Sequence, residues 1–397
     1  MKTVGIVAEY NPFHAGHRKQ FDRVKAEFGG ETAIVCAMSG NYVQRGAPAV
    51  MDKTLRAKAA VACGADLVVE LPTTVSLSSA EGFAAGGVGI LSKLCDALCF
   101  GAETGEAELL METARALLSE DFSPLLRREL DGGKSFPAAR AGALAQMGLS
   151  GEILRRPNDI LAVEYCKAIL ELGAALVPIP LPRQGAGHGQ ALTETGGQFA
   201  SASALRTLWQ KGGADAAAPY VPAEVLPLYR EAFSAGQYTD LAAAQRCQLA
   251  LLRSRCAGTA PFAQVRGISE GLEHRLEAAV RSSTTHAELL DSLTTVRYPR
   301  ARMRRLAMDA ALNYSADAFP ALPPYLHLLG AQKDALPLLK AAALPVSHSL
   351  ARLAEQNVPC RAVVDAQLRA CDFGALCRKK PEPMGGALRQ KIIFLTK

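Results

Sequence analysis

The sequence predicts an α/β protein, in which a parallel sheet covered by helices on both faces is followed by a mostly helical, basic domain. Two observations predict it. Over residues 1–185, short and continuously apolar runs alternate with amphipathic helical stretches, which is typical of parallel strands buried on both faces. From about residue 212 onward Leu, Ala and Arg dominate, strand signals fade, and Pro and Gly separate helical runs.

Strands and helices alternate in the first part of the chain. The predicted strands are Thr3–Ala8, Thr32–Met38, Ala65–Leu71, Ala97–Phe100 and Ala175–Leu181, and the predicted helices are Gly16–Ala26, Asp52–Ala62, Ser79–Leu94, Glu106–Leu118 and Asp159–Leu172. Ligands of such sheets bind at the carboxyl ends of the strands. The loops there that carry unusual polar residues are Glu9–His17, Ser39–Arg45, Gly101–Glu103 and Arg183–His188.

The chain of 397 residues is long enough for two domains, which we place at residues 1–211 and 212–397. Lys391–Leu395, at the end of the chain, has the pattern of a strand that returns from the second domain. Charge divides in a similar way, because residues 1–200 hold 19 Lys and Arg against 22 Asp and Glu, whereas residues 201–397 hold 25 against 16. The second domain is therefore expected to meet a polyanion.

Composition excludes several classes of protein. With 49% hydrophobic and 21% charged residues the chain is neither disordered nor collagen-like, and its longest apolar runs are too short to span a bilayer. The N-terminus moves straight into a strand and lacks a signal-peptide pattern, so we expect a cytoplasmic protein that does not contact a membrane. The 10 cysteines form no Cys-x-x-Cys pair, so we expect reduced thiols and no metal site.

The strongest motif is His14-Ala15-Gly16-His17, between the first strand and the first helix. A helix N-terminus attracts phosphate through its free N–H groups and dipole, and Gly16 lets a nucleotide lie against the backbone. His14 and His17 are the candidate catalytic residues, because two imidazoles three residues apart can donate to a phosphate chain and stabilise a pentavalent transition state. The alternative is a pair of capping or solvent-exposed histidines.

A second phosphate site is predicted at Ser201-Ala202-Ser203-Ala204-Leu205-Arg206. Ser201 and Ser203 supply small hydroxyls at a helix start, and Arg206 follows about one turn later, so together they can bind outer phosphates. The alternative is an ordinary serine N-cap followed by a surface arginine.

Together the two motifs resemble the HIGH-type nucleotidyltransferase superfamily, with its HxGH element and its late ISSTxxR-like element. Ala200 and Ala202 stand where the late element usually has Ile and its second Ser. The resemblance implies a Rossmann-like HIGH-superfamily nucleotidyltransferase sheet in the first domain. Class I aminoacyl-tRNA synthetases share the HxGH element, but nothing in the chain resembles their KMSKS loop, and a P-loop is absent.

A narrower resemblance extends over residues 1–305. The chain is similar to the bacterial tRNA(Met) cytidine acetate ligase family in seven blocks that keep the family's order. These blocks are Gly5–His17 (GIVAEYNPFHAGH), Met38–Gly46 (MSGNYVQRG), Gly64–Pro72 (GADLVVELP), Phe100–Glu103 (FGAE), Pro157–Leu161 (PNDIL), Arg266–Glu273 (RGISEGLE) and Arg297–Arg302 (RYPRAR).

The resemblance implies an enzyme that uses ATP, expected to arrive with Mg²⁺, to activate acetate as acetyl-adenylate. The acetyl group would then pass to the exocyclic amine of the wobble cytidine of elongator tRNA(Met). The resemblance places ATP along Val7, Ala8, Glu9, Tyr10, Asn11, Pro12, Phe13, His14, Ala15, Gly16, His17, Arg18, Lys19 and Gln20, with Gly101, Asn158 and Arg183 as further contacts. Ala102 replaces an expected Ser, and Gly185–His188 matches the family's loop in part. Asn41, Gln44 and Arg45 are additional candidates.

An arginine-rich stretch is the candidate RNA contact. Residues 297–305 hold five arginines and one tyrosine. We expect Arg297, Arg300, Arg302, Arg304 and Arg305 to contact tRNA phosphates, and Tyr298 to offer a stacking platform for a base. The alternative is a solvated helix face.

Two other functions stay open at this point. A small-molecule cofactor nucleotidyltransferase would use the same HxGH site but would not need a second, basic domain. A tRNA-binding protein with a regulatory nucleotide site would keep the basic domain without the chemistry.

Overall fold

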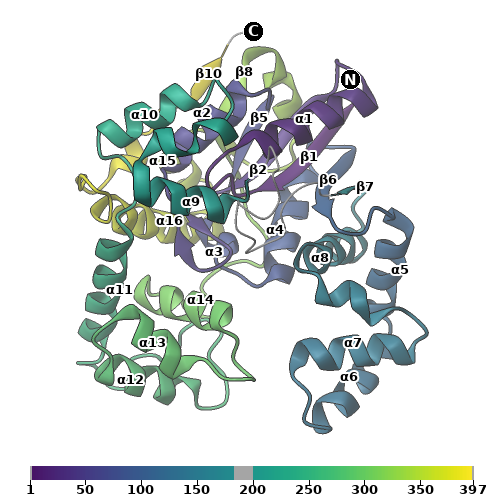
Figure 1. Ribbon diagram of the computed structural model, residues 1–397, viewed down its shortest axis with the longest axis vertical. Coiled ribbons are helices and arrows are strands. Elements are labelled where there is room, and N and C mark those ends of the chain that lie inside the picture. The colour runs from purple at the N-terminus through teal and green to yellow at the C-terminus, as the bar shows by residue number, and fades with distance from the viewer. Residues whose placement is uncertain (1, 183–199, 396–397) are drawn as a thin grey trace.

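One sheet organises the molecule. In the computed structural model, which describes residues 2–182 and 200–395, this sheet has eight strands in the order β10-β8-β5-β2-β1-β6-β7, with β9 paired to β8 (Figure 1). The strands are β1 (Thr3–Ala8), β2 (Ala33–Ser39), β5 (Leu67–Leu71), β6 (Ala97–Ala102), β7 (Val177–Pro182), β8 (Leu326–Gln332), β9 (Val346–Ser347) and β10 (Ile393–Leu395). Neighbours are parallel except β5 and β8, which run antiparallel. The order reverses at β1 and β6, where such sheets bind ligands.

The strands form where the sequence is continuously apolar, as predicted. All seven residues of β2 are buried. Because successive side chains alternate between faces, Ile34 and Cys36 pack into one core cluster, and Val35 and Ala37 into the other. The sheet is therefore covered on both sides, which confirms the predicted fold class.

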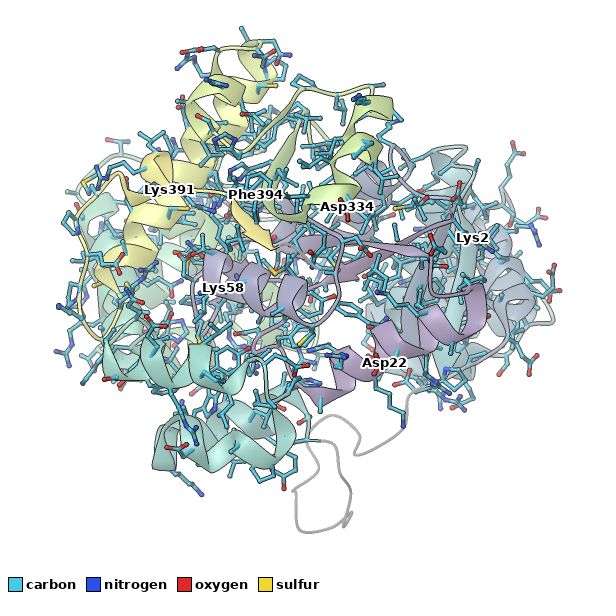
Figure 2. All side chains as sticks on the ribbon, turned by 90° about the horizontal axis from the view of Figure 1, so that it is seen from above. Lys2, Asp22, Lys58, Asp334, Lys391 and Phe394 are labelled. Atoms are coloured by element: carbon cyan, nitrogen blue, oxygen red, sulfur yellow. The ribbon has the colours of Figure 1, made fainter. Side chains whose placement is uncertain are left out.

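Helices form the two outer layers. On one face lie α1 (Ala15–Phe28), α2 (Lys53–Ala62), α9 (Ala202–Gly212) and α10 (Leu226–Ser234) with the short helix η3 (Ala214–Tyr220), and on the other lie α4 (Ala80–Leu91), α5 (Ala107–Leu118) and α8 (Pro157–Glu171) with η4 (Lys333–Ala341). Figure 2 shows α1, which carries Asp22, beside α2, which carries Lys58, with the C-terminal strand and Phe394 next to α2.

Two helical lobes extend beyond these layers, at the lower left and lower right of Figure 1. One lobe holds α11 (Leu241–Arg255), α12 (Leu272–Ser282), α13 (His286–Leu293) and α14 (Arg300–Ala311) around its own core, and the other holds α6 (Phe122–Asp131), α7 (Phe136–Gln146) and η1 (Gly151–Arg155). The remaining helices are α3 (Thr73–Ser76), α15 (Leu350–Ala354), α16 (Val358–Leu376) and η5 (Gly386–Arg389). Within the described ranges, no helix has both the length and the apolar character needed to cross a membrane.

The sequence missed two strands of the sheet, β8 and β9, and misplaced some ends. Strand β8 comes from the part of the chain in which strand signals fade, yet it lies between β5 and β10. Helices α6 and α7 were not predicted, α4 ends at Leu91 instead of Leu94, and β6 continues to Ala102. The domain boundary between residues 211 and 212 stays a prediction. Strands β8 and β10 of the second half join strands of the first half in one sheet.

A fully buried arginine joins the carboxyl ends of the central strands. Arg56 of α2 is 0% exposed, and its guanidinium donates to the carbonyls of Glu9, Ser39, Gly40 and Met51. Burial lowers the pKa of Arg56 to about 10, so the side chain stays charged at neutral pH. It therefore satisfies four carbonyls that lie where β1 and β2 end and α2 begins.

We expect Arg56→Met to lower the free energy of unfolding by about 3–5 kcal/mol, because the carbonyls lose a charged donor and stay buried. Lys58→Met is the matched control, since Lys58 is an exposed residue of the same helix, and its effect should stay within about 0.5 kcal/mol. Urea unfolding followed by circular dichroism measures both. Equal midpoints and slopes for Arg56→Met and the parent protein would contradict this role.

Candidate functional site

A cavity of about 540 Å³ opens at the carboxyl ends of β1, β6 and β7. Its volume lies within the range that accommodates a small-molecule ligand, and it occupies the switch point of the sheet. Side chains from α1, α8 and α9 complete its wall.

The turn between β1 and α1 forms the floor of this pocket, and three elements fix its backbone. The carbonyl of Glu9 accepts from Arg56 of α2, and that of Asn11 accepts from Arg206 Nη1 of α9 at 2.6 Å. The carbonyl of Phe13 accepts from the Tyr229 hydroxyl of α10 at 3.0 Å. The Asn11–Pro12 peptide bond is cis. Because partners far apart in the sequence hold the turn, its geometry is set before any ligand binds.

His14 and His17 form a capping box at the start of α1. His14 Nδ1 accepts from the Gly16 N–H at 3.1 Å, and His17 Nδ1 accepts from the His14 N–H at 3.2 Å. An accepting Nδ1 carries no proton, so each neutral ring carries its proton on Nε2. The rings stack at 3.8 Å between centroids. The capping alternative and the phosphate-binding interpretation are therefore compatible, since capping sets the tautomer that donates from Nε2.

Glycine at position 16 has a steric role that the sequence did not predict. A Cβ at Gly16 would lie 2.9 Å from Cε1 of His14. The glycine thus makes room for the imidazole ring of His14, in addition to lining the pocket.

Most of the predicted nucleotide contacts line the pocket. They are Val7, Ala8, Glu9, Tyr10, Asn11, His14, Gly16, His17, Lys19, Gln20, Gly101, Asn158, Ser201 and Arg206. Pro12 and Phe13 are buried beneath the turn, and Arg18 pairs with Asp22 and Glu224 outside the pocket. Arg183 and the Gly185–His188 loop lie outside the described residues.

The Ser201–Arg206 motif both caps helix α9 and contributes to the wall of the pocket. Ser201 caps α9, since its hydroxyl accepts from the Ala204 N–H at 3.3 Å, and Ser203 hydrogen-bonds to that hydroxyl at 3.0 Å. Arg206, one turn later, lies at the pocket with its guanidinium on the Asn11 carbonyl. Burial lowers the pKa of Arg206, while Glu9 opposes the shift. A cation that is partly desolvated interacts more strongly with an incoming phosphate.

A reciprocal clasp places Asn158 at the opposite wall. The Glu103 carboxylate accepts from Asn158 Nδ2 at 2.6 Å and from the Asp159 N–H at 2.9 Å. The Asp159 carboxylate in turn accepts from the N–H groups of Glu103 and Thr104, each at 2.8 Å. The end of β6 and the start of α8 are thereby locked together around Gly101 and Asn158.

A small hairpin of β3 (Tyr42–Val43) and β4 (Ala47–Pro48) joins the pocket to the basic lobe. At its turn, Gln44 N donates to Glu9 Oε1 at 2.7 Å, and both Gln44 and Arg45 line the pocket. On the other side, the Gln44 carbonyl accepts from Arg305 of α14 at 3.3 Å. Asn41 does not reach the nucleotide pocket and instead binds Lys53 N at 2.9 Å.

The predicted RNA-contacting residues lie on and just before α14 in different settings. Arg297 and Arg300 are exposed and pair with Glu270 and Asp291. Tyr298 is half-buried, with Arg302 5.1 Å above its ring. Arg304 and Arg305 are half-buried, and desolvation, followed by nearby arginines, lowers the pKa of Arg304. Their role in RNA binding stays a prediction.

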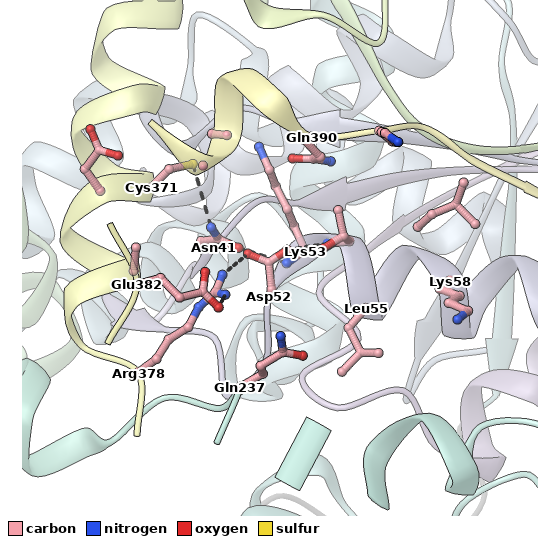
Figure 3. A pocket seen from close by; sticks show the side chains of 17 residues that line it. Asn41, Asp52, Lys53, Leu55, Lys58, Gln237, Cys371, Arg378, Glu382 and Gln390 are labelled. Atoms are coloured by element: carbon pink, nitrogen blue, oxygen red, sulfur yellow. Dashed lines mark hydrogen bonds and ion pairs between the residues drawn. The ribbon is translucent and has the colours of Figure 1, made fainter. Parts of the chain in front are cut away.

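A second cavity, of about 390 Å³, lies between the start of α2 and the C-terminal segment (Figure 3). Its polar side chains hold one another, because Arg378 donates to Asp52 Oδ2 at 2.6 Å and Asn41 Nδ2 lies 3.7 Å from Cys371 Sγ. These contacts connect the N-terminal end of α2 with helix α16 and the segment that follows it.

Sequence reasoning missed the aromatic part of the pocket. Phe83, Phe100 and Tyr165 line it from α4, β6 and α8. Each lies within a predicted helix or strand, where an aromatic residue is ordinarily part of the core. An apolar, aromatic wall beside hydrogen-bond donors suits a nucleobase.

A family model described as HIGH Nucleotidyl Transferase matches residues 1–385. Fold and site thus define a HIGH-type nucleotidyltransferase. The tRNA(Met) cytidine acetate ligase of Acetivibrio thermocellus is 31% identical over an alignment of 423 positions that covers 100% of both chains, and that of Geobacillus sp. (strain WCH70) is 32% identical with 83% of each covered. Thermotoga maritima TmcAL, bound with alpha-thio ATP or apo, is 28% identical over 100% of both chains, with TM-scores of 0.88 and 0.90. The chain belongs to the tRNA(Met) cytidine acetate ligase family.

We expect His14→Asn to separate capping from phosphate chemistry. Asparagine is a good N-cap, so stability should stay within about 0.5 kcal/mol of the parent, whereas His14→Ala should lose about 1 kcal/mol. Both variants should release pyrophosphate from ATP about 100-fold or more slowly, because the Nε2–H donor is gone. Thermal unfolding and a pyrophosphate assay measure the two effects, and an undiminished rate in His14→Asn would contradict the catalytic assignment.

Proposed function

We propose that the chain is an ATP-dependent tRNA acetate ligase, which forms acetyl-adenylate and acetylates the exocyclic amine of the wobble cytidine of elongator tRNA(Met). The family relationship supports the ligase activity and the use of ATP. The choice of acetate, the elongator tRNA and a cytoplasmic location are part of the proposal.

The pocket residues suit adenylate formation. An oxygen of acetate attacks the α-phosphorus of ATP, and the bond to the bridging oxygen of the β-phosphate breaks, which releases pyrophosphate. Acetate needs no base, since it is ionised at neutral pH. The Nε2–H groups of His14 and His17 are suited to stabilise the charge on the reacting phosphates, and Arg206 to neutralise the departing pyrophosphate.

The remaining ATP contacts follow from the same arrangement. We propose that Gly101 and Asn158 hold the nucleoside part beside the aromatic wall, and that Mg²⁺ enters with the ATP phosphates. Within residues 2–182 and 200–395, His, Cys, Asp and Glu side chains do not gather into a metal site of their own.

The observation that carries the tRNA part of the proposal is the shared hairpin. Its turn bonds Glu9 in the nucleotide pocket on one side and Arg305 of the arginine-rich helix on the other. A small-molecule nucleotidyltransferase has no need of a basic helix at this position. Phosphates held by Arg297, Arg300 and Arg304 would place an anticodon loop beside the reacting centre.

Incubation of the pure protein with ATP, labelled acetate and tRNA should produce acetylated cytidine, and omission of any one of the three should abolish it. Nucleoside digestion followed by chromatography measures the product. Pyrophosphate release driven by a phosphorylated metabolite, without transfer from acetate, would favour a cofactor nucleotidyltransferase. ATP and tRNA binding without either reaction would favour a regulatory nucleotide site.

The combined variant Arg297→Gln, Arg300→Gln, Arg304→Gln should weaken tRNA binding about tenfold or more and reduce the salt slope by about two to three, because each arginine that is lost removes a phosphate contact. A matched control replaces Arg352, Arg361 and Arg389, which lie on or beside the C-terminal helices, and removes the same net charge. Filter binding over a range of salt concentrations measures both. Equal losses in the two triple variants would show that only net charge matters.

A further inference from the structure

A carboxylate lies in a pocket that is otherwise suited to anions. Glu9 is half-buried at the end of β1 and lines the cavity together with His14, His17 and Arg206. The reacting groups that ATP and acetate bring there are phosphates and a carboxylate, and a negative side chain beside them opposes their binding. Glu9 therefore needs a role other than anion binding.

The surroundings of Glu9 fix its position and favour proton uptake. Oε1 accepts from Gln44 N at 2.7 Å, and within the described part of the chain Oε2 makes no hydrogen bond. Burial raises the pKa of Glu9, and this effect exceeds the opposite one of the Gln44 N–H and of Arg56, Arg206 and Arg45. A carboxylate with a raised pKa is a better proton acceptor near neutral pH than an exposed one.

Glu9 lies on the side of the pocket next to the arginine-rich helix α14, where we propose that RNA binds. The peptide of Gln44 contacts Glu9 through its N–H and Arg305 of α14 through its carbonyl. Glu9 is thus separated from the basic helix by one residue of the hairpin. The clasp that holds Gly101 and Asn158 belongs to β6 and α8 at the opposite wall.

We propose that Glu9 is the general base of acetyl transfer, a role that rests on the proposed function. The amine lone pair of cytidine forms the N–C bond at the acetyl carbonyl carbon. The C–O bond to the AMP phosphate breaks, and its electron pair leaves with AMP. The proton lost by the amine passes to Oε2 of Glu9 and then to water.

The chemistry of the two steps explains why only the second needs this base. The exocyclic amine of cytosine is conjugated with its ring and is a poor nucleophile, and attack makes its N–H strongly acidic. A carboxylate within hydrogen-bond reach traps the product of attack by removing that proton. Acetate has no proton to lose in the first step.

The test compares two half-reactions in Glu9→Gln, which keeps the shape of the side chain and an oxygen for the Gln44 N–H. Adenylation is measured as acetate-dependent exchange of labelled pyrophosphate into ATP without RNA. Transfer is measured in a single turnover from synthetic acetyl-adenylate to tRNA. We expect transfer to slow about 100-fold or more, exchange to fall by much less, and Glu9→Asp to recover part of the transfer rate.

The pH profile supplies a second readout. Transfer by the parent protein should decline as pH falls through the raised pKa of Glu9, because the protonated carboxyl cannot accept a proton. Glu9→Gln should lose this decline. The charged or titratable groups that face Glu9 are Arg45 of the hairpin, Arg56 of α2, Tyr165 of α8, Arg206 of α9, and His14 and His17 of α1. A decline that persists in Glu9→Gln belongs to a histidine and overturns the assignment.

Glu81→Gln is the control, since Glu81 is a 63% exposed acid of α4 outside the pocket, and both half-reactions should match the parent. Equal losses of exchange and transfer in Glu9→Gln would indicate a contact with ATP or acetate and would overturn the proposal. An unchanged transfer rate would do the same. If the parent protein itself shows no acetate-dependent exchange or transfer, the proposed function fails instead.

Discussion

The structure depends on the buried guanidinium of Arg56. Strands β1 and β2 end side by side, and the carbonyls that follow them turn into the interior, where water cannot satisfy them. Arg56, in the first turn of α2, donates to the carbonyls of Glu9, Ser39 and Gly40 at these strand ends and to that of Met51 just before α2. A lysine would bring one nitrogen to the same place, whereas the planar guanidinium reaches several acceptors at once. The turn that carries Glu9 is thereby fixed relative to β2 and the hairpin.

Further contacts to backbone carbonyls position the rest of the pocket. Arg206 and Tyr229 hold the carbonyls of Asn11 and Phe13, so the HxGH segment is fixed from helices that lie about 200 residues away in the sequence. His14 and His17 then form the capping box at the start of α1. Side chains positioned in this way lose little freedom when a ligand binds, which is the arrangement that enzymes use to pre-organise charge stabilisation.

The sequence predicted the parts of the fold that local patterns encode. Apolar runs such as β2 and the HxGH turn can be recognised because period and motif are visible within ten residues. Strand β8 could not be recognised, since its sequence LHLLGAQ includes a histidine and a glutamine that are buried. His327 is tolerated there because Glu70 of β5 and the His348 carbonyl bond its ring, and Lys53 in turn pairs with Glu70 at 2.8 Å. Such a buried network is visible only once the strands are assembled, as are Arg56 and the aromatic wall.

The hairpin connects the basic helix to the nucleotide pocket. Gly46 has a φ of +76°, and a Cβ there would lie 2.7 Å from the Arg305 nitrogen, so the turn packs directly on the backbone of α14. The arginines of that helix are then held at a set distance from Glu9 through one peptide unit. Arg304 and Arg305 are half-buried, so their positive charge is poorly solvated, which strengthens its attraction to phosphate. The arginine side chains that we propose to hold RNA would therefore extend from a backbone whose position relative to Glu9 is set, which is what transfer to one particular base requires.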